Sequence, residues 1–192
     1  MKNNSIIIGI TGAFGSGKST AAQFFAAKGY TQITLSSFLE AEAKKRGSEP
    51  ITRKLLQDIG NELRVKEGKG ILAKKALQFI EEQQLTKVII DGIRNLGEVE
   101  ALQKHGNFFL IGIIADRTVR FDRLQKNKRR ELLDKDVFKQ LDYRDLGIGE
   151  TQDGLQVYYY LALADHFIDN NSTEQVFDEK LNDLLKKVEQ SL

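Results

Sequence analysis

Five short apolar segments recur along the chain, and each has the length of a single β-strand. Several of them are apolar almost throughout, which is typical of strands that helices cover on both faces. Strands of this kind that alternate with helical stretches predict an α/β fold built on a parallel sheet. The five predicted strands are Ser5–Ile10, Tyr30–Leu35, Lys87–Asp91, Phe108–Ala115 and His166–Asp169.

Helical segments fill most of the chain between these strands. Five of them connect or follow strands directly, namely Ser19–Lys28, Glu98–His105, Thr118–Lys128, Leu155–Ala164 and Glu174–Glu189. The stretch Ser37–Gln84 has no strand pattern and predicts about three helices, with breaks near Gly47–Pro50 and Glu67–Gly70. A second helical excursion, Asn127–Asp153, separates the fourth strand from the fifth. We therefore expect one compact domain with two helical additions to its sheet.

The composition of the 192-residue chain is that of a globular protein, with 41% hydrophobic and 29% charged residues. Its net charge of +2 is too small to indicate nucleic-acid binding through bulk charge. The absence of cysteine excludes disulfides, thiol nucleophiles and zinc–thiolate sites. No apolar run approaches the roughly 20 residues of a membrane-spanning helix, and the first residues lack a signal-peptide pattern. We therefore expect a cytoplasmic protein without membrane or nucleic-acid partners.

The first predicted strand is followed by a glycine-rich loop that matches the pattern G-x-x-x-x-G-K-[ST]. A strand before the loop and a helix after it form the context in which this motif cradles phosphates. The backbone N–H groups of such a loop form an anion nest, and the helix adds the positive end of its dipole. A glycine-rich turn without a ligand is the alternative, but it leaves the flanking strand and helix unexplained. The predicted residues for binding the phosphates of a nucleoside triphosphate are Gly12, Ala13, Phe14, Gly15, Ser16, Gly17, Lys18, Ser19 and Thr20.

Two residue types in this region suit a magnesium nucleotide. Lys18 can reach the β- and γ-phosphates, and the hydroxyl of Ser19 can hold Mg²⁺. The third predicted strand ends in Asp91, and P-loop proteins place a carboxylate beside Mg²⁺ at the carboxyl end of a central strand. We therefore expect ATP as co-substrate and Mg²⁺ as cofactor, with Ser19 and Asp91 as metal ligands.

The chain continues from this aspartate as Asp91-Gly92-Ile93-Arg94. Together with the P-loop, this tetrapeptide resembles the Asp-Gly-Phe/Tyr-Pro-Arg segment of adenylate kinases and other nucleoside monophosphate kinases. The arginine of that family contacts the acceptor phosphate, which implies the same role for Arg94. Ile93 replaces the aromatic residue and the family's proline is missing, so the local turn can differ.

The resemblance is strongest to the archaeal adenylate-kinase-related proteins and to the kinase-like domains found beside deoxycytidylate deaminases. Both are similar in the tetrapeptide and in the helix start Gly154-Leu155-Gln156-Val157. The resemblance covers most of the chain and implies a three-layer P-loop NTPase fold, with a five-stranded parallel sheet of order 2-3-1-4-5. It implies a single kinase domain with its core in residues 1–36, 85–126 and 154–192. Residues 37–84 would form the acceptor-binding insertion, and residues 127–153 the lid.

We expect the acceptor to bind in this insertion. The pair Ser36-Ser37 resembles the Ser-Thr that opens the monophosphate-binding helices of the family. Arg53 and Arg64 lie close to three helical turns apart and can share a face that binds the acceptor phosphate, although each could equally be a surface arginine. The amide of Gln57 could read a base edge or face solvent. Glu40 departs from the family, because adenylate kinases usually place an arginine near that point.

Basic residues are dense from Asp116 to Arg130, where the family begins its lid. Lid arginines supply bidentate donors to the transferred phosphoryl group and exclude water, which the resemblance implies for Arg123, Arg129 and, on the return helix, Arg144. A solvated basic helix face is the alternative for this cluster. The segment Asn170-Asn171 resembles the loop in which the donor adenine lies. The predicted catalytic set is Lys18, Asp91, Arg94, Arg123, Arg129 and Arg144.

These features predict a phosphotransferase that moves the γ-phosphate of ATP to a nucleoside or deoxynucleoside monophosphate. The first alternative is dephospho-CoA kinase or another kinase that acts on a hydroxyl. Those enzymes carry an aspartate after the second strand to accept the hydroxyl proton, whereas Ser36-Ser37 stands there in this chain. The second alternative is a regulatory module that binds nucleotides without turnover. Small-molecule nucleotides are the expected partners, and the chain is expected to be a monomer or homodimer.

Overall fold

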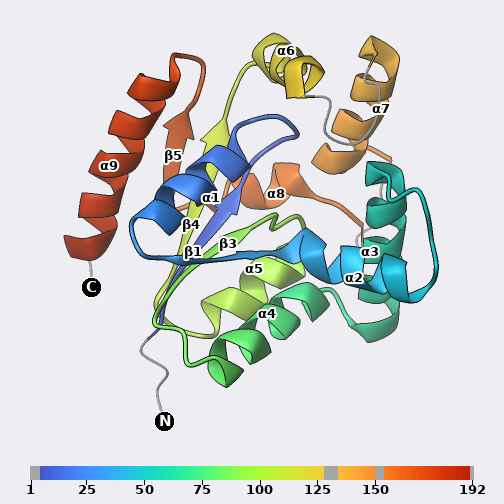
Figure 1. The fold of residues 1–192 in the computed structure, drawn as a ribbon, viewed down its shortest axis with the longest axis horizontal. Helices are drawn as coiled ribbons and strands as arrows, with labels where there is room; N and C mark the ends of the chain where they lie inside the picture. Colours follow the sequence, from blue (N-terminus) through green and yellow to red (C-terminus); the bar gives the residue numbers. More distant parts are fainter. Residues whose placement is uncertain (1–4, 128–133, 150–153, 191–192) are drawn as a thin grey trace.

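A parallel sheet of five strands forms the centre of the molecule (Figure 1). The computed structural model describes residues 5–127, 134–149 and 154–190. The strand order is β2-β3-β1-β4-β5 and every pairing is parallel, so the predicted fold and strand order are confirmed. The strands are β1 (Ile6–Thr11), β2 (Thr31–Thr34), β3 (Lys87–Asp91), β4 (Phe108–Ile114) and β5 (His166–Asp169).

Helices cover both faces of this sheet, which gives three layers (Figure 1). Neighbouring residues of one strand point to opposite faces, so Ile7 packs with α2–α5 and α8, whereas Ile8 packs with α1 and α9. This two-sided burial explains why the central strands read as unbroken apolar runs. The helices are α1 (Lys18–Ala27), α2 (Leu35–Lys45), α3 (Arg53–Glu67), α4 (Ile71–Glu82), α5 (Leu96–Gln103), α6 (Arg117–Asn127), α7 (Lys135–Leu146), α8 (Val157–Leu161) and α9 (Glu174–Gln190).

The boundaries of several elements differ from those that the sequence pattern predicts. Helix α2 begins directly after β2, so the pair Ser36-Ser37 lies in the first helical turn and the strand ends at Thr34. Helix α5 begins at Leu96, two residues before the predicted start, because Asn95 and Glu98 form a capping box. Within the described ranges, no helix has both the length and the apolar character to cross a membrane.

A buried ion pair joins the insertion to the sheet. The carboxylate of Glu98 is fully buried, and its Oε1 accepts hydrogen bonds from Nε (3.1 Å) and Nη2 (2.8 Å) of Arg64 on α3. Its Oε2 accepts from the backbone N–H groups of Arg94 (2.8 Å) and Asn95 (3.2 Å). Both oxygens are thus satisfied, and one side chain fixes α3 to the β3–α5 loop that carries Arg94.

This pair should contribute strongly to stability. Glu98→Gln removes the charge that balances the buried Arg64, and leaving one partner of a buried pair uncompensated costs about 3–5 kcal/mol. We expect a fall of this size in the free energy of unfolding measured by denaturant titration. Glu62→Gln is the control, because Glu62 pairs with Arg46 on the surface and should change stability by about 1 kcal/mol or less. Equal effects of the two substitutions would contradict the structural role of Glu98.

Candidate functional site

The glycine-rich loop connects β1 to α1 at the carboxyl end of the sheet (Figure 1). Gly17 has a φ of 105°, and a Cβ atom there would lie 2.2 Å from Nδ2 of Asn170. Gly12 has a φ of 148°, and a Cβ atom there would lie 2.3 Å from the carbonyl oxygen of Ile113. Both positions therefore require glycine for backbone conformation and for space. The predicted phosphate-binding residues Ser19 and Thr20 lie in the first turn of α1.

Lys18 is nearly buried under this loop, with 8% of the residue exposed. Its Nζ donates hydrogen bonds to the carbonyl oxygens of Gly12 (2.7 Å) and Ala13 (2.9 Å). Burial and, to a smaller extent, the positive charge of Arg94 lower the pKa of Lys18 to about 7, although Asp145 and Asp91 oppose the shift. The lysine is thus held in the place from which it can reach a phosphate, but it is only partly charged near neutral pH.

Ser19 and Asp91 stand together where a magnesium ion is expected. The Oγ of Ser19 lies 3.5 Å from Oδ2 of Asp91. The other oxygen, Oδ1 of Asp91, is buried and has no hydrogen-bond partner among the described residues. A hydroxyl beside an orphaned carboxylate oxygen fits Mg²⁺, which takes one or two protein oxygens and completes its shell with waters and phosphates. The described residues contain no group of three or more His, Cys, Asp or Glu side chains placed to hold a metal.

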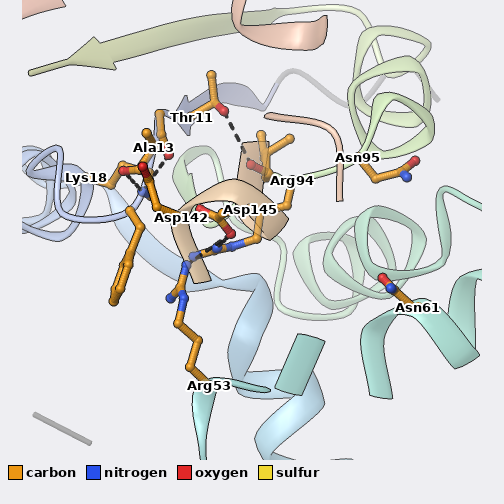
Figure 2. A network of polar contacts seen from close by, with 12 residues as sticks. Thr11, Ala13, Lys18, Arg53, Asn61, Arg94, Asn95, Asp142 and Asp145 are labelled. Atoms are coloured by element: carbon orange, nitrogen blue, oxygen red, sulfur yellow. Dashed lines mark hydrogen bonds and ion pairs between the residues drawn. The ribbon is translucent and has the colours of Figure 1, made fainter. Parts of the chain in front are cut away.

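Two arginines meet a carboxylate beside Lys18 (Figure 2). Nη2 of Arg53, from α3, donates to Oδ1 of Asp145 at 3.0 Å, and Nη1 of Arg94, from the β3–α5 loop, donates to the same oxygen. The side chain of Asp145, on α7, is completely buried. Its pKa lies below the ordinary value, because Arg94, Arg53 and Lys18 together outweigh the effect of burial.

Sequence reasoning missed this carboxylate. Asp142 and Asp145 lie three positions apart on α7 and are both fully buried, which places them on one inward face of the helix. That spacing was the available signal, but nothing in the sequence shows which arginines these aspartates meet.

A small cavity opens next to the two arginines. Its lining includes Arg53, Arg94 and Gln57, together with Ser36 and apolar side chains from α2, and its volume is about 50 Å³. Gln57 is 5% exposed, and neither its Oε1 nor its Nε2 has a hydrogen-bond partner within the described ranges. The structure therefore brings together the predicted acceptor residues Ser36, Arg53, Gln57 and Arg94. Ser37 lies apart, since it is exposed and its hydroxyl donates to the carbonyl oxygen of Thr34 at 2.7 Å.

Helix α7 also packs against the P-loop and α6, through contacts that do not involve Asp145. The ring of Phe138 stacks on that of Phe14 in the loop, with the centroids 6.2 Å apart. Asp142 pairs with Arg120 and, at 3.2 Å, with Arg117. Nη1 of Arg120 also donates to the carbonyl of Phe14 at 2.9 Å, so it joins the P-loop, α6 and α7.

Several predicted site residues have other partners in this structure. Arg64 lines the cavity, but its guanidinium group donates two hydrogen bonds to Glu98. This corrects the expectation that Arg64 is available to the acceptor. Arg144 pairs with Asp58 of α3 at 2.7 Å instead of joining the arginines around Asp145. Arg129 lies outside the described residues.

The expected adenine-binding residues also have structural partners. The buried amide of Asn170 donates to the carbonyl of Ser16 at 2.9 Å and accepts from Nη2 of Arg123 at 3.3 Å. Arg123 is therefore linked to the P-loop through Asn170, whereas the resemblance implied a contact with the transferred phosphate. Asn171 binds Asp116, with its Oδ1 accepting from the backbone N–H at 2.7 Å.

The chain matches known proteins along nearly its whole length. A family model described as "AAA domain" matches residues 8–142. A UPF0200 protein of Sulfurisphaera tokodaii is 33% identical over 185 residues, which cover 95% of this chain and 97% of that protein. A UPF0200 protein of Methanocaldococcus jannaschii is 34% identical over 182 residues, which cover 93% of this chain and 87% of that protein.

Solved structures support the same fold at low sequence identity. TT1252 from Thermus thermophilus aligns with a TM-score of 0.60 and 20% identity and covers 98% of both chains. Shikimate kinase from Acinetobacter baumannii, solved in complex with shikimate, aligns with a TM-score of 0.59 and 16% identity, covering 98% of this chain and 96% of that one. The sheet order, the P-loop and these alignments define a P-loop kinase-like fold. The chain belongs to the UPF0200 family and carries an AAA-type P-loop domain.

Proposed function

We propose that this protein transfers the γ-phosphate of ATP to a nucleoside or deoxynucleoside monophosphate. The observation that carries the proposal is the convergence of Lys18, Arg94 and Arg53 at one point of the cleft, beside the cavity that holds the open amide of Gln57. A donor phosphate held by the P-loop and an acceptor phosphate held by two arginines would face each other across that point. Phosphoryl transfer depends mostly on such positioning and charge stabilisation.

Each group in the cleft has a role in this reaction. The backbone N–H groups of Gly12–Ser19 would hold the donor phosphates, and Lys18 would pair with the β- and γ-oxygens as their charge shifts. Arg53 and Arg94 would bind the acceptor phosphate through their guanidinium forks and orient its oxygen toward the γ-phosphorus. Ser19 and Asp91 would hold Mg²⁺, which supplies charge neutralisation at the phosphates when it is bound. An ionised phosphate acceptor needs no general base.

A second candidate is transfer to a hydroxyl group. The absence of an aspartate after β2 argued against such an acceptor, but α7 brings the carboxylate of Asp145 into the same cleft. A carboxylate near the transferred phosphate can accept a hydroxyl proton. The fold is also shared with shikimate kinase, whose structure is described with shikimate bound. The position of Asp145 is thus the observation that favours a hydroxyl acceptor.

The first test is an acceptor panel. ATP consumption and product formation would be measured with Mg²⁺ and each common nucleoside and deoxynucleoside monophosphate, and with dephospho-CoA and shikimate as hydroxyl acceptors. We expect transfer to a monophosphate, because two arginines are placed for its phosphate. Lys18→Met should bind the acceptor but lose transfer. A faster reaction with a hydroxyl acceptor would reverse the ranking, and ATP binding without any turnover would favour the regulatory module.

The second test uses the pKa of Lys18. With a pKa of about 7, most of this amine is neutral in the free protein at about pH 8. Phosphate oxygens stabilise the ammonium form and raise the pKa, so binding of Mg²⁺–ATP at that pH should take up close to one proton. Calorimetry in two buffers of different ionisation enthalpy measures this uptake. Lys18→Met should bind ATP without it, and an equal uptake in that variant would show that another group titrates.

The third test concerns Gln57. Its buried amide lacks partners within the described ranges, so Gln57→Leu should raise the free energy of unfolding by about 1–3 kcal/mol. The same substitution removes the hydrogen bonds that the amide would make to an acceptor base, and it should raise the KM for the acceptor about ten- to hundredfold without changing the KM for ATP. Gln103→Leu, at an exposed position of α5, is the matched control. A variant that is more stable but binds the acceptor normally would remove Gln57 from the site.

A further inference from the structure

Asp145 occupies an unusual position for a carboxylate in a site that is expected to bind phosphates. Its side chain is fully buried, 3.0 Å from Nη2 of Arg53 and hydrogen-bonded to Nη1 of Arg94 (Figure 2). The two arginines come from different segments, α3 and the β3–α5 loop, and meet on one oxygen, Oδ1. The other oxygen, Oδ2, is buried and has no hydrogen-bond partner within the described part of the chain. The arginine pair could therefore satisfy a ligand with more acceptor oxygens better than it satisfies Asp145.

A phosphate group has the chemistry that such a pair prefers. Guanidinium groups bind carboxylates and phosphates through the same parallel N–H···O bonds, and a phosphate offers more oxygens and more charge. A phosphate bound to Arg53 and Arg94 could not share the buried site with Asp145, because two like charges a few ångströms apart repel strongly in a low dielectric. The site can hold the carboxylate or the phosphate, one at a time.

The cavity next to the two arginines is small. With Asp145 in place, the space beside the two arginines is about 50 Å³. Pockets for small-molecule ligands are usually several times larger, roughly 300–1,000 Å³. A mononucleotide therefore requires this space to widen, and two of the residues that line it, Arg53 and Arg94, are the ones that Asp145 bridges.

We propose that Asp145 is an internal substitute for the acceptor phosphate, which holds Arg53 and Arg94 until a phosphate group displaces it. Helix α7 then acts as a competitor that is built into the chain. The proposal rests on the proposed function only in taking the displacing anion to be the acceptor's phosphate. The helix has separate anchors, since Phe138 packs on Phe14 and Asp142 pairs with Arg117 and Arg120. Of the two buried aspartates of α7, Asp145 pairs with Arg53 and Arg94, whereas Asp142 pairs with Arg117 and Arg120.

These two aspartates provide a matched experiment. The full chain would be titrated calorimetrically with inorganic phosphate and with nucleoside monophosphates, in the absence of ATP, as wild type, Asp145→Asn and Asp142→Asn. Removal of the competing charge should make Asp145→Asn bind both probes at least about tenfold more tightly. Asp142→Asn loses a buried carboxylate from the same helix, and it should bind both probes as the wild type does.

The other outcomes are equally informative. Weaker binding by Asp145→Asn, or unchanged binding with transfer retained, would overturn the proposal, and weaker binding would make Asp145 a residue that positions the arginines. Unchanged binding with loss of transfer would also overturn it and assign Asp145 to proton acceptance from a hydroxyl. Tighter phosphate binding without transfer to any monophosphate would support the proposal while the proposed function fails.

A second measurement avoids the variants and so remains available if one of them fails to fold. Hydrogen exchange of the amides in α7 would be followed in the wild-type chain with and without inorganic phosphate. Displacement of Asp145 should speed exchange in Lys135–Leu146 relative to α9, whose buried residues pack with α1 in a separate core cluster. Unchanged or slower exchange in α7 at saturating phosphate would overturn the proposal.

Discussion

The pairing of buried guanidinium groups with buried carboxylates is the constraint on which the functional end of this molecule depends. Removing a charge from water costs several kcal/mol, and a buried ion is tolerated only when a partner of opposite charge offsets that cost. Glu98 supplies this charge to Arg64, Asp142 supplies it to Arg120, and Asp145 serves Arg53 and Arg94 together. The insertion, the β3–α5 loop, α6 and α7 are held at the carboxyl edge of the sheet by these three carboxylates.

The three carboxylates differ in how completely they are satisfied, and this difference separates structure from function. Glu98 uses both oxygens, which accept from two atoms of Arg64 and from two backbone N–H groups, so no ligand could improve on the arrangement. Asp145 leaves one oxygen unpaired among the described residues while two arginines share the other. Asp91 also leaves one oxygen unpaired, beside the hydroxyl of Ser19. Incomplete satisfaction marks the places where phosphate and metal are expected to complete the bonding.

The sequence was sufficient for features that depend on local pattern. Apolar runs defined the five strands, and the glycine-rich motif located the loop, with Lys18 and Ser19 at the start of a helix as expected. Partners that are distant in the chain were beyond such reasoning. Asp145 lies 92 positions from Arg53 and 51 from Arg94, and no periodicity links them. The same limit explains why Arg64 was predicted to bind the acceptor phosphate. Its residue type and spacing suit a phosphate ligand, but it pairs with Glu98, 34 positions away.

The choice between a phosphate and a hydroxyl acceptor now depends on what happens to one carboxylate. Ser36-Ser37 favoured a phosphate acceptor because no general base follows the second strand, but α7 supplies a carboxylate from another direction, so that absence no longer decides the question. A base must stay beside the acceptor during transfer, whereas a group that competes with the acceptor phosphate must leave before transfer begins. Asp145 cannot do both in one reaction. Because its pKa is held low by two arginines and Lys18, it is a weak proton acceptor but a strong competitor for the same cations, and this balance favours displacement by a phosphate.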